Sequence, residues 1–386
     1  MAVIKFFLSL CLGLISSQLF AAVLPDDQAD VLYHRYEGGG ITVDGPSVLV
    51  RKGYKDKISA WGNYYTDSIS GASIDLLAQG STYYEEERTE TSVGLDYLHD
   101  KTIMSISATN SSERDYEANS FALSLSQDFF GDMSTFSMNY SQGNDEVRQN
   151  IYEDGSIVET IDRGKARHQR FGLGLSQVLT KTLIISANAE AVIDDGFLNN
   201  PYRSVRYEES DGTLGREPEK YPETRNSDAF ALRGMYYLPY RAALRAEYRI
   251  YRDSWGIDAN NWELRYIHPI QQWTLEAKVR GYEQSQADFY SDLFPYADAQ
   301  NYRARDKEMS AFSNQAFGLG ASYDWQQTYL SWADNTTLNL YWDFIQFDYQ
   351  NFRENTPDNT NEYGAGNEPL YGFGANVIRA FISIKY

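Results

Sequence analysis

Apolar and polar residues alternate along most of the chain, from residue 57 to the last residue. Within residues 183–191, Leu183, Ile185 and Ala187 fall on one face, whereas Ser186 and Asn188 fall on the other. Successive side chains of a β-strand point to opposite sides, so this period of two predicts strands with one apolar and one polar face. Segments with such alternation cover residues 57–67, 88–98, 102–110, 119–128, 136–141, 167–179, 183–191, 227–238, 241–252, 260–267, 272–283, 313–325, 336–349 and 371–386.

The last segment keeps this alternation up to the final residue. Ile378, Ile382, Ile384 and Tyr386 share one face, opposite Arg379. An aromatic residue that ends an amphipathic strand resembles the C-terminal signal of bacterial outer-membrane β-barrels, although a soluble β-sandwich can also end in this way. With Ile382, Ile384 and Tyr386 as the assembly signal, we expect the barrel-assembly machinery and periplasmic chaperones to be partners.

The connections between the segments alternate between short and long. Short ones lie at residues 99–101, 129–132, 179–181, 238–241, 268–271 and 331–335, and long ones at 68–87, 143–166, 194–226, 285–308 and 350–370. Short periplasmic turns and longer outer loops are typical of outer-membrane barrels, as are aromatic residues near the strand ends. The sequence therefore predicts an all-β, transmembrane, antiparallel up-and-down barrel of about fourteen strands, with both termini on the periplasmic side.

The part of the chain before residue 57 alternates least. Residues 22–56 contain the glycine run Gly38–Gly40, and we predict a periplasmic or lumen-entering segment there. We place the barrel in residues 57–386, with its last strand pairing with residues 57–67. If Val48–Arg51 begins a true hairpin, the number of strands becomes sixteen.

Composition agrees with an exported barrel. Residues 1–21 have a positive start and an apolar core, and they resemble a secretory signal peptide, so we expect export to the outer membrane. The single cysteine, Cys11, lies in this segment, which leaves the mature protein without thiol chemistry or disulfides. The mean hydropathy of −0.52 is compatible with a barrel, because only alternate residues face lipid. A net charge of −20 argues against nucleic acid as a partner.

Three stretches carry a resemblance to a known family. They read YHRYEGGGITVDGPSVLVRK (Tyr33–Lys52), NYYTDSISGASID (Asn63–Asp75) and LDYLHDKTIMSISATNSSERDYEANSFALSLSQDFFGD (Leu95–Asp132). They are similar to an uncharacterised family of Gram-negative outer-membrane proteins, the domain of unknown function 3570 family. The resemblance runs through most of the mature chain and implies an outer-membrane barrel. It supplies no catalytic or binding residues.

If the apolar faces contact lipid, the polar faces line the lumen. The charged residues assigned to the lumen are Arg233, Arg245, Glu247, Arg249, Glu263, Arg265, Glu276, Lys278 and Arg280. Two interpretations remain open because both require the same residues. One is a salt-bridged wall that is compatible with water, and the other is a charged constriction that sets the selectivity of a pore.

The remaining polar residues give weaker signals. The outer loops are acidic, as in Glu208, Glu209 and Glu219. We interpret them as a solvated surface that meets outer-membrane lipid and lipopolysaccharide, and cations bridging to lipopolysaccharide phosphates are the functional alternative. His34, His99 and His268 are predicted near the periplasmic end without the spacing of a metal site, so we expect no metal and no cofactor.

These observations lead to three functional hypotheses. The favoured one is a channel or transport protein with a charge-lined lumen. The second is a non-catalytic scaffold that docks an unknown periplasmic or surface partner through Tyr33–Lys52. The third is a hydrolase, because His168 with Asp194 and Asp195 faintly resembles the acid–histidine arrangement of omptin proteases. We do not expect an enzyme.

Overall fold

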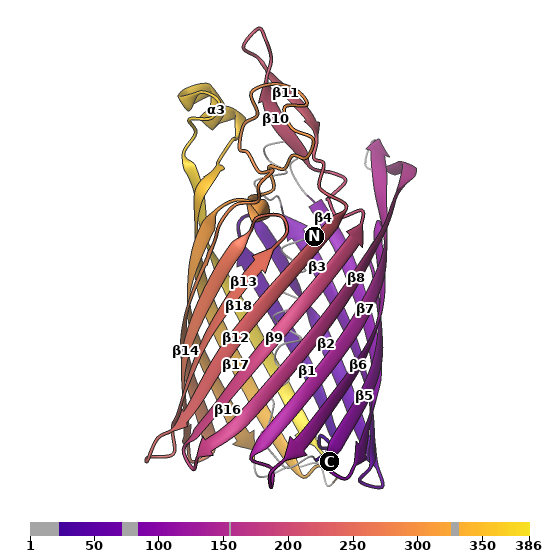
Figure 1. Ribbon diagram of the computed structural model, residues 1–386, viewed down its shortest axis with the longest axis vertical. Coiled ribbons are helices and arrows are strands. Elements are labelled where there is room, and N and C mark those ends of the chain that lie inside the picture. The colour runs from indigo at the N-terminus through magenta and orange to yellow at the C-terminus, as the bar shows by residue number, and fades with distance from the viewer. Residues whose placement is uncertain (1–22, 72–83, 154–155, 326–331) are drawn as a thin grey trace.

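Sixteen antiparallel strands close into one barrel in the computed structural model (Figure 1). The structure describes residues 23–71, 84–153, 156–325 and 332–386, so the predicted signal peptide, residues 1–21, lies outside the described residues. In chain order the wall strands are β1 (Gln28–Gly38), β2 (Ile41–Tyr54), β3 (Ile58–Gly71), β4 (Tyr84–His99), β5 (Thr102–Ser112), β6 (Tyr116–Phe129), β7 (Ser134–Glu153), β8 (Ser156–Thr180), β9 (Leu183–Gly196), β12 (Thr224–Tyr237), β13 (Ala243–Asp253), β14 (Asp258–Ile270), β15 (Trp273–Gln284), β16 (Phe312–Trp325), β17 (Asn335–Arg353) and β18 (Leu370–Lys385).

Outside the wall, the described chain forms four small elements. Strands β10 (Ser204–Glu208) and β11 (Leu214–Pro218) pair with each other, and the others are the 3-10 helix η2 (Lys307–Met309) and the helix α3 (Pro357–Tyr363). No helix in the described ranges is long and apolar enough to cross a membrane.

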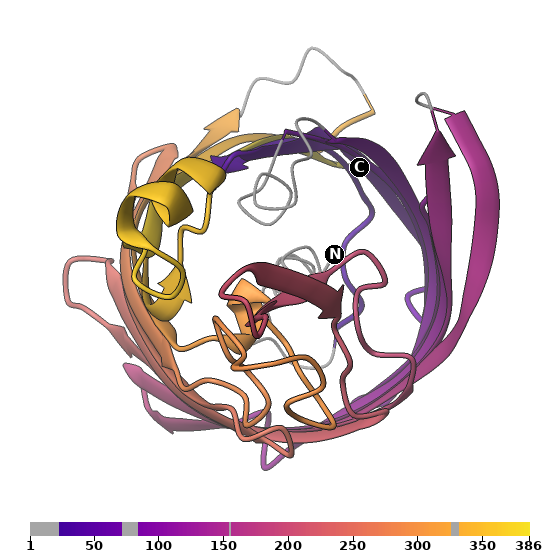
Figure 2. The same cartoon turned by 90° about the horizontal axis from the view of Figure 1, so that it is seen from above.

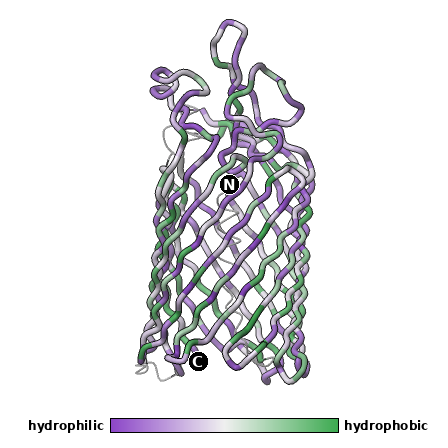
Figure 3. The backbone as a smooth tube through the Cα atoms, turned by 60° about the vertical axis from the view of Figure 1, so that its left-hand side comes forward, coloured by the Kyte–Doolittle hydropathy of each residue, from purple (hydrophilic) through white to green (hydrophobic). Residues whose placement is uncertain are grey.

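The outer face of the barrel wall is apolar. Leu173 of β8, Phe230 of β12 and Ile250 of β13 are 50%, 46% and 49% exposed. Each is flanked along its strand by residues that face the interior, and Figure 3 shows apolar and polar residues alternating along the wall. Contact with lipid requires this pattern, since only alternate side chains of a wall strand reach the bilayer. The predicted transmembrane barrel is confirmed.

The two ends of the barrel have different connections. At the end where the C-terminus lies, tight turns join the strands, and Lys55, Asp100 and Gln271 in these turns have φ of 53°, 50° and 54°. Such left-handed conformations are common in short hairpin turns. The opposite end carries the long connections at residues 197–223, 285–311 and 354–369 (Figure 1). The end with the C-terminus is therefore the periplasmic end.

The barrel begins earlier than the sequence predicted. Strand β1 pairs with both β2 and β18, so residues 28–54 are wall strands rather than a periplasmic or lumen-entering segment. The glycine run that suggested an irregular segment forms the turn of this hairpin, with φ of 60° at Gly39 and 79° at Gly40. The count of fourteen strands is wrong, and the alternative of sixteen is correct.

The first hairpin also changes two other predictions. The last strand closes the barrel against β1, from Gln28↔Lys385 to Gly38↔Ala375, and not against residues 57–67. Tyr33–Lys52, which was predicted to dock a partner, is built into the wall.

The predicted long loop at residues 143–166 is largely a hairpin. Strands β7 and β8 pair from Ser134↔Gln177 up to Glu153↔Ser156, with irregularities in register after Val147 and Ile151. These irregularities sit where the hairpin extends beyond the rest of the wall (Figure 1). The sequence pattern fails there because β-bulges shift the alternation by one residue.

Three outer loops, residues 197–223, 285–311 and 354–369, fold together, and we call them the loop cap. Figure 2 shows β10, β11 and the second loop lying over the barrel mouth, with α3 at its edge. Bridges at Tyr207↔Phe294 and Lys220↔Arg303 join the first loop to the second. Buried apolar side chains from the loops and strand ends form a core beneath them: Tyr221, Trp255, Ile257, Ala287, Phe289, Tyr290, Ala304, Met309, Phe312, Tyr349 and Phe352.

Candidate functional site

The structure places all nine predicted lumen residues on the inner face of the wall. On β13, β14 and β15 these residues alternate with outward residues such as Tyr248, Leu264 and Val279, which are 51%, 41% and 38% exposed. The nine residues are Arg233, Arg245, Glu247, Arg249, Glu263, Arg265, Glu276, Lys278 and Arg280.

Most of these residues form ion pairs with one another. Arg233 donates to Glu247 at 2.6 Å. Arg265 contacts Glu263 and Glu276, each at 3.1 Å, through different guanidinium nitrogens. The side chains of Arg265, Glu263 and Glu276 are 16%, 15% and 17% exposed, so this triad is packed into the wall rather than free in the lumen.

The register of the strands places like charges directly opposite each other. Glu247 pairs with Glu263, and Arg245 pairs with Arg265 across the same two strands. Directly opposed like charges destabilise a sheet, so the stabilising contacts must run along a strand or diagonally. The observed Arg245–Glu247 contact at 3.2 Å is of this kind. Across the strands, Arg245 is followed by Arg265 and Lys278 as a basic row, whereas Glu247 and Glu263 lie between Arg233 and Arg280.

Four further charged residues belong to the same wall, although the sequence analysis did not assign them to the lumen. Asp343 of β17 contacts Lys278 at 2.8 Å and Arg379 of β18 at 3.1 Å. Glu190 of β9 lies 3.8 Å from Arg170 of β8 and 3.4 Å from Arg249. The alternation of polar and apolar residues would have placed these four residues on the polar face. Each lies on a strand that has few other charged residues at the same height in the wall. We call these four residues and the nine predicted ones the charged strip.

The middle of the wall formed by β5, β6 and β7 is different, because its inward residues are small and uncharged. The register aligns Ser107 with Ala122, and Ser124 with Asn139. Similar residues continue the lining: Ser105, Thr109, Ser120, Ser137, Ser141, Gly172 and Gly174. The charged strip therefore occupies one part of the lumen wall, and hydroxyl-rich small residues occupy another.

His168 is held between two carboxylates. Its Nδ1 lies 2.7 Å from Asp194, and its Nε2 lies 3.0 Å from Asp145 on β7. The other aspartate of the predicted arrangement, Asp195, does not take part, because it lies on the opposite face of β9. A general base needs a nitrogen directed at a substrate or water, whereas both nitrogens of His168 face carboxylates.

The other histidines give no metal site. His34 lies mid-strand in β1 rather than at the periplasmic end, where its Nε2 is 2.8 Å from Asp67 and its ring stacks on Tyr65. His99 and His268 lie near the periplasmic ends of β4 and β14. In the described ranges, no three His, Cys, Asp or Glu residues gather as a metal would require.

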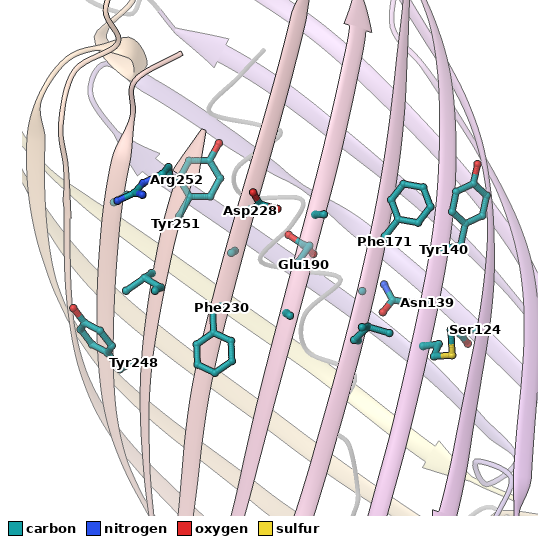
Figure 4. A pocket seen from close by; sticks show the side chains of 18 of the residues that line it. Ser124, Asn139, Tyr140, Phe171, Glu190, Asp228, Phe230, Tyr248, Tyr251 and Arg252 are labelled. Atoms are coloured by element: carbon teal, nitrogen blue, oxygen red, sulfur yellow. The ribbon is translucent and has the colours of Figure 1, made fainter. Parts of the chain in front are cut away.

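An apolar groove runs over the outer face of β8, β9 and β12 (Figure 4). Phe171 and Phe230 flank it, and Ala189 lies between them on β9. Asp228 and Arg252 stand at its outer end. Its lining combines outward residues such as Phe171 and Phe230 with inward ones such as Ser124, Asn139 and Glu190.

Buried ions tie the three loops of the cap together. Arg206 of β10 donates to Asp292 at 2.5 Å and to Glu368 at 3.0 Å, and Arg305 donates to Asp292 at 2.9 Å. Arg206 is 2% exposed and Glu368 is fully buried. Because these partners come from three different loops, the network fixes the loops relative to one another.

Two further carboxyl groups of the cap have shifted pKa values. Burial, reinforced by repulsion from Asp306, raises the pKa of Glu219 to about 7 and that of Glu308 to about 7. At Glu368, burial also favours the neutral form, but the hydrogen bonds from Arg206 outweigh it and lower the pKa to about 2.

The sequence profile of a family described as "protein of unknown function (DUF3570)" matches residues 77–341. The chain belongs to this family. The sequence of this DUF3570 chain resembles a family of outer-membrane proteins, and its sixteen-stranded barrel is consistent with that resemblance. No curated protein is similar to it in sequence.

Several solved structures share the fold of this DUF3570 protein. A bacterial polysaccharide outer membrane secretin superposes with a TM-score of 0.50 at 6% identity, over 94% of this chain and 100% of that one. OccK2 (OpdF) of Pseudomonas aeruginosa, solved in complex with glucuronate, gives 0.42 at 10% identity, over 94% and 99%. A Pseudomonas aeruginosa FadL homologue gives 0.38 at 9% identity, over 94% and 91%. At these identities the likeness shows the fold alone, that of an outer-membrane barrel.

Proposed function

We propose that this protein is a channel through which small hydrophilic solutes cross the outer membrane. The observation that carries the proposal is a closed wall of sixteen strands whose inner face is polar and charged. Barrels of 16–18 strands are wide enough to leave an aqueous channel, whereas those of about eight strands are filled by their own side chains. The large expanse of small inward residues on β5, β6 and β7 leaves room for water and solute.

The charged strip supports a role in the passage of solutes, and not only a lumen wall that is compatible with water. Opposite charges directly across from each other stabilise a wall, but here Arg245, Arg265 and Lys278 lie side by side as a row of three cations. Rings and rows of charge inside a pore set which ions enter it.

Conductance of the purified, folded mature chain in planar lipid bilayers tests the proposal. We expect stepwise currents, and we expect Ser124→Trp and Asn139→Trp to reduce them, because both side chains face the lumen from the small-residue wall. Leu123→Trp is the matched control, since Leu123 is 45% exposed on the outer face of the same strand. Folded protein that carries no current would overturn the channel.

A scaffold is the second candidate, and the loop cap favours it. Three loops held by buried ions present a defined surface over the mouth. In that role the barrel would hold the cap for a surface partner, and bilayers containing folded protein would stay silent. We also infer a non-catalytic role, supported by the two carboxylates that occupy both nitrogens of His168. Turnover of any substrate that His168→Ala abolishes, in a variant that still folds, would contradict this inference.

A further inference from the structure

Cations outnumber carboxylates in the charged strip, although the whole chain is acidic. The strip contains eight basic side chains and five carboxylates, which leaves an excess of three positive charges. The basic members are Arg170, Arg233, Arg245, Arg249, Arg265, Lys278, Arg280 and Arg379, and the acidic members are Glu190, Glu247, Glu263, Glu276 and Asp343.

Two of these excess charges fall on three arginines, Arg170, Arg249 and Arg280. Arg170 and Arg249 share one carboxylate, Glu190, at 3.8 Å and 3.4 Å. Among the described residues Arg280 has no carboxylate within 4 Å, and its guanidinium lies 5.8 Å from the ring centre of Tyr282. By contrast, the other five basic members each lie within 3.3 Å of a carboxylate.

Two of these arginines, Arg170 and Arg249, have side chains that are accessible from the lumen. The side chains of Arg170 and Arg249 are 43% and 42% exposed, against 16% for Arg265. Arg249 and Arg280 stand on either side of β14 and repel each other, while Glu263, directly opposite Arg280, attracts it. At the height of these arginines the inward residues of β5, β6 and β7 are uncharged, so these strands offer no carboxylate that would offset the positive charge.

Two of the acidic residues nearer the outer end of the lumen have arginine partners of their own. Glu90 contacts Arg88 at 2.5 Å, and Asp253 contacts Arg225 at 2.5 Å. Asp145 and Asp194 hold His168 between them.

We propose that the lumen selects anions, and that Arg170, Arg249 and Arg280 form the site that binds them. The inference rests on the proposed channel and names its substrate class: small organic anions with a carboxylate group. A guanidinium matches a carboxylate through two parallel hydrogen bonds, so a pair of accessible arginines recognises such a group better than a free chloride ion. The rest of the solute would pass along the hydroxyl-rich small residues.

Reversal potentials measured across a KCl gradient in planar bilayers test the selectivity. We expect the wild-type channel to prefer chloride over potassium. Arg249→Gln and Arg280→Gln should each lower that permeability ratio about twofold, which is the effect of one unit charge roughly 8 Å from a permeant ion in water. Citrate added to one chamber should interrupt the current of the wild type, and the double variant should lose this block.

The control is Arg252→Gln on the outer face of β13, where Arg252 pairs with Asp258 away from the lumen. It should leave selectivity and block unchanged. Absence of current from folded wild-type protein would contradict the channel itself. A channel that conducts but prefers potassium, or whose citrate block survives in the double variant, would overturn this inference alone.

Discussion

Among single residues, Asp343 has a central place in the charged strip. It contacts two cations from neighbouring strands, Lys278 at 2.8 Å and Arg379 at 3.1 Å. Its side chain is only 12% exposed, so water screens these contacts weakly. Loss of its charge would leave both cations without this partner.

We therefore expect Asp343→Asn to change stability and selectivity together. Unfolding in urea from lipid vesicles should show a loss of about 2 kcal/mol, below the 3–5 kcal/mol typical of a fully buried pair because the lumen is wet. In KCl gradients the preference for chloride should rise about twofold, since one negative charge is removed from the wall. Asp228→Asn on the outer face serves as the control. A stable variant with unchanged selectivity would show that Asp343 does not contribute to the charge of the strip.

At this scale the sequence gives the face of a residue but not its partners. Alternation alone placed Arg249 and Arg280 on the inner side of strands β13 and β15. It could not show that Arg265 has two carboxylates and Arg280 none, because ion pairing depends on the register of neighbouring strands. Alternation could have assigned Glu190 and Asp343 to the lumen, but it could not have shown their ion pairs with Arg249, Lys278 and Arg379.

Among the elements, the loop cap depends on contacts between distant parts of the chain. Arg206 and Glu368 lie 162 positions apart in sequence. The loops that carry them show no hydrophobic period, so their meeting was not predictable. The first hairpin was missed for a local reason. A side chain at Gly45 would collide with the backbone oxygen of Thr66 at 1.8 Å, so the close approach of β2 and β3 requires a glycine there.

We expect Glu368→Gln to loosen the cap without unfolding the barrel. The variant leaves Arg206 buried beside Asp292 with one partner fewer, which costs about 2–3 kcal/mol of cap stability. Limited proteolysis of intact cells should cut the outer loops faster, and bilayer currents should become noisier. Glu362→Gln, at an exposed position on α3, is the matched control. Unchanged proteolysis in Glu368→Gln would show that the network does not hold the loops.

The cap should also loosen as the pH rises. The carboxyl groups of Glu219 and Glu308 have pKa values of about 7 in the folded cap against an ordinary value of 4.5, so between these values the folded cap binds more protons than the open one. Its stability is therefore complete below about pH 4.5 and falls as pH rises through 7. Asp306 opposes ionisation of both groups, and Arg203 favours it.

Proteolysis of the outer loops at pH 6 and pH 8 checks this expectation, with faster cutting at pH 8. The outer loops of the double variant Glu219→Gln/Glu308→Gln should be cut at the same rate at pH 6 and at pH 8. Slower cutting of the wild type at pH 8 than at pH 6 would contradict the raised pKa values of Glu219 and Glu308.

At the scale of the whole molecule, the C-terminal residue joins both ends of the wall. The backbone N–H of Tyr386 donates to Asp27, and its hydroxyl donates to the carbonyl of Arg51, each at 3.1 Å. Lys52 lies 4.8 Å from the centre of the Tyr386 ring, and Trp332 packs edge-on against it at 5.8 Å. The barrel architecture was predictable from the sequence because polar and apolar residues alternate in nearly every wall strand. The residue at which the first wall strand begins was not predictable.

We expect Tyr386→Asp, or deletion of Tyr386, to reduce assembly into the outer membrane several-fold. The change removes the aromatic end of the final strand and places a negative charge at the closing position. Heat-modifiable mobility of membrane fractions measures the folded barrel. Tyr363→Asp on α3 adds the same charge in an outer loop and should assemble normally. A normal amount of barrel from Tyr386→Asp would refute the role of this residue.

The seam between β1 and β18 has a consequence for how the chain reaches its folded form. The seam joins residues near opposite ends of the polypeptide, such as Gln28 and Lys385. Contacts of such long separation carry a large entropic cost of loop closure and fold slowly. Until β18 is in place, the hydrogen-bonding edge of β1 has no covering strand on one side. An open edge of this kind promotes aggregation. The time before closure is therefore when this protein depends most on being kept apart from its own copies.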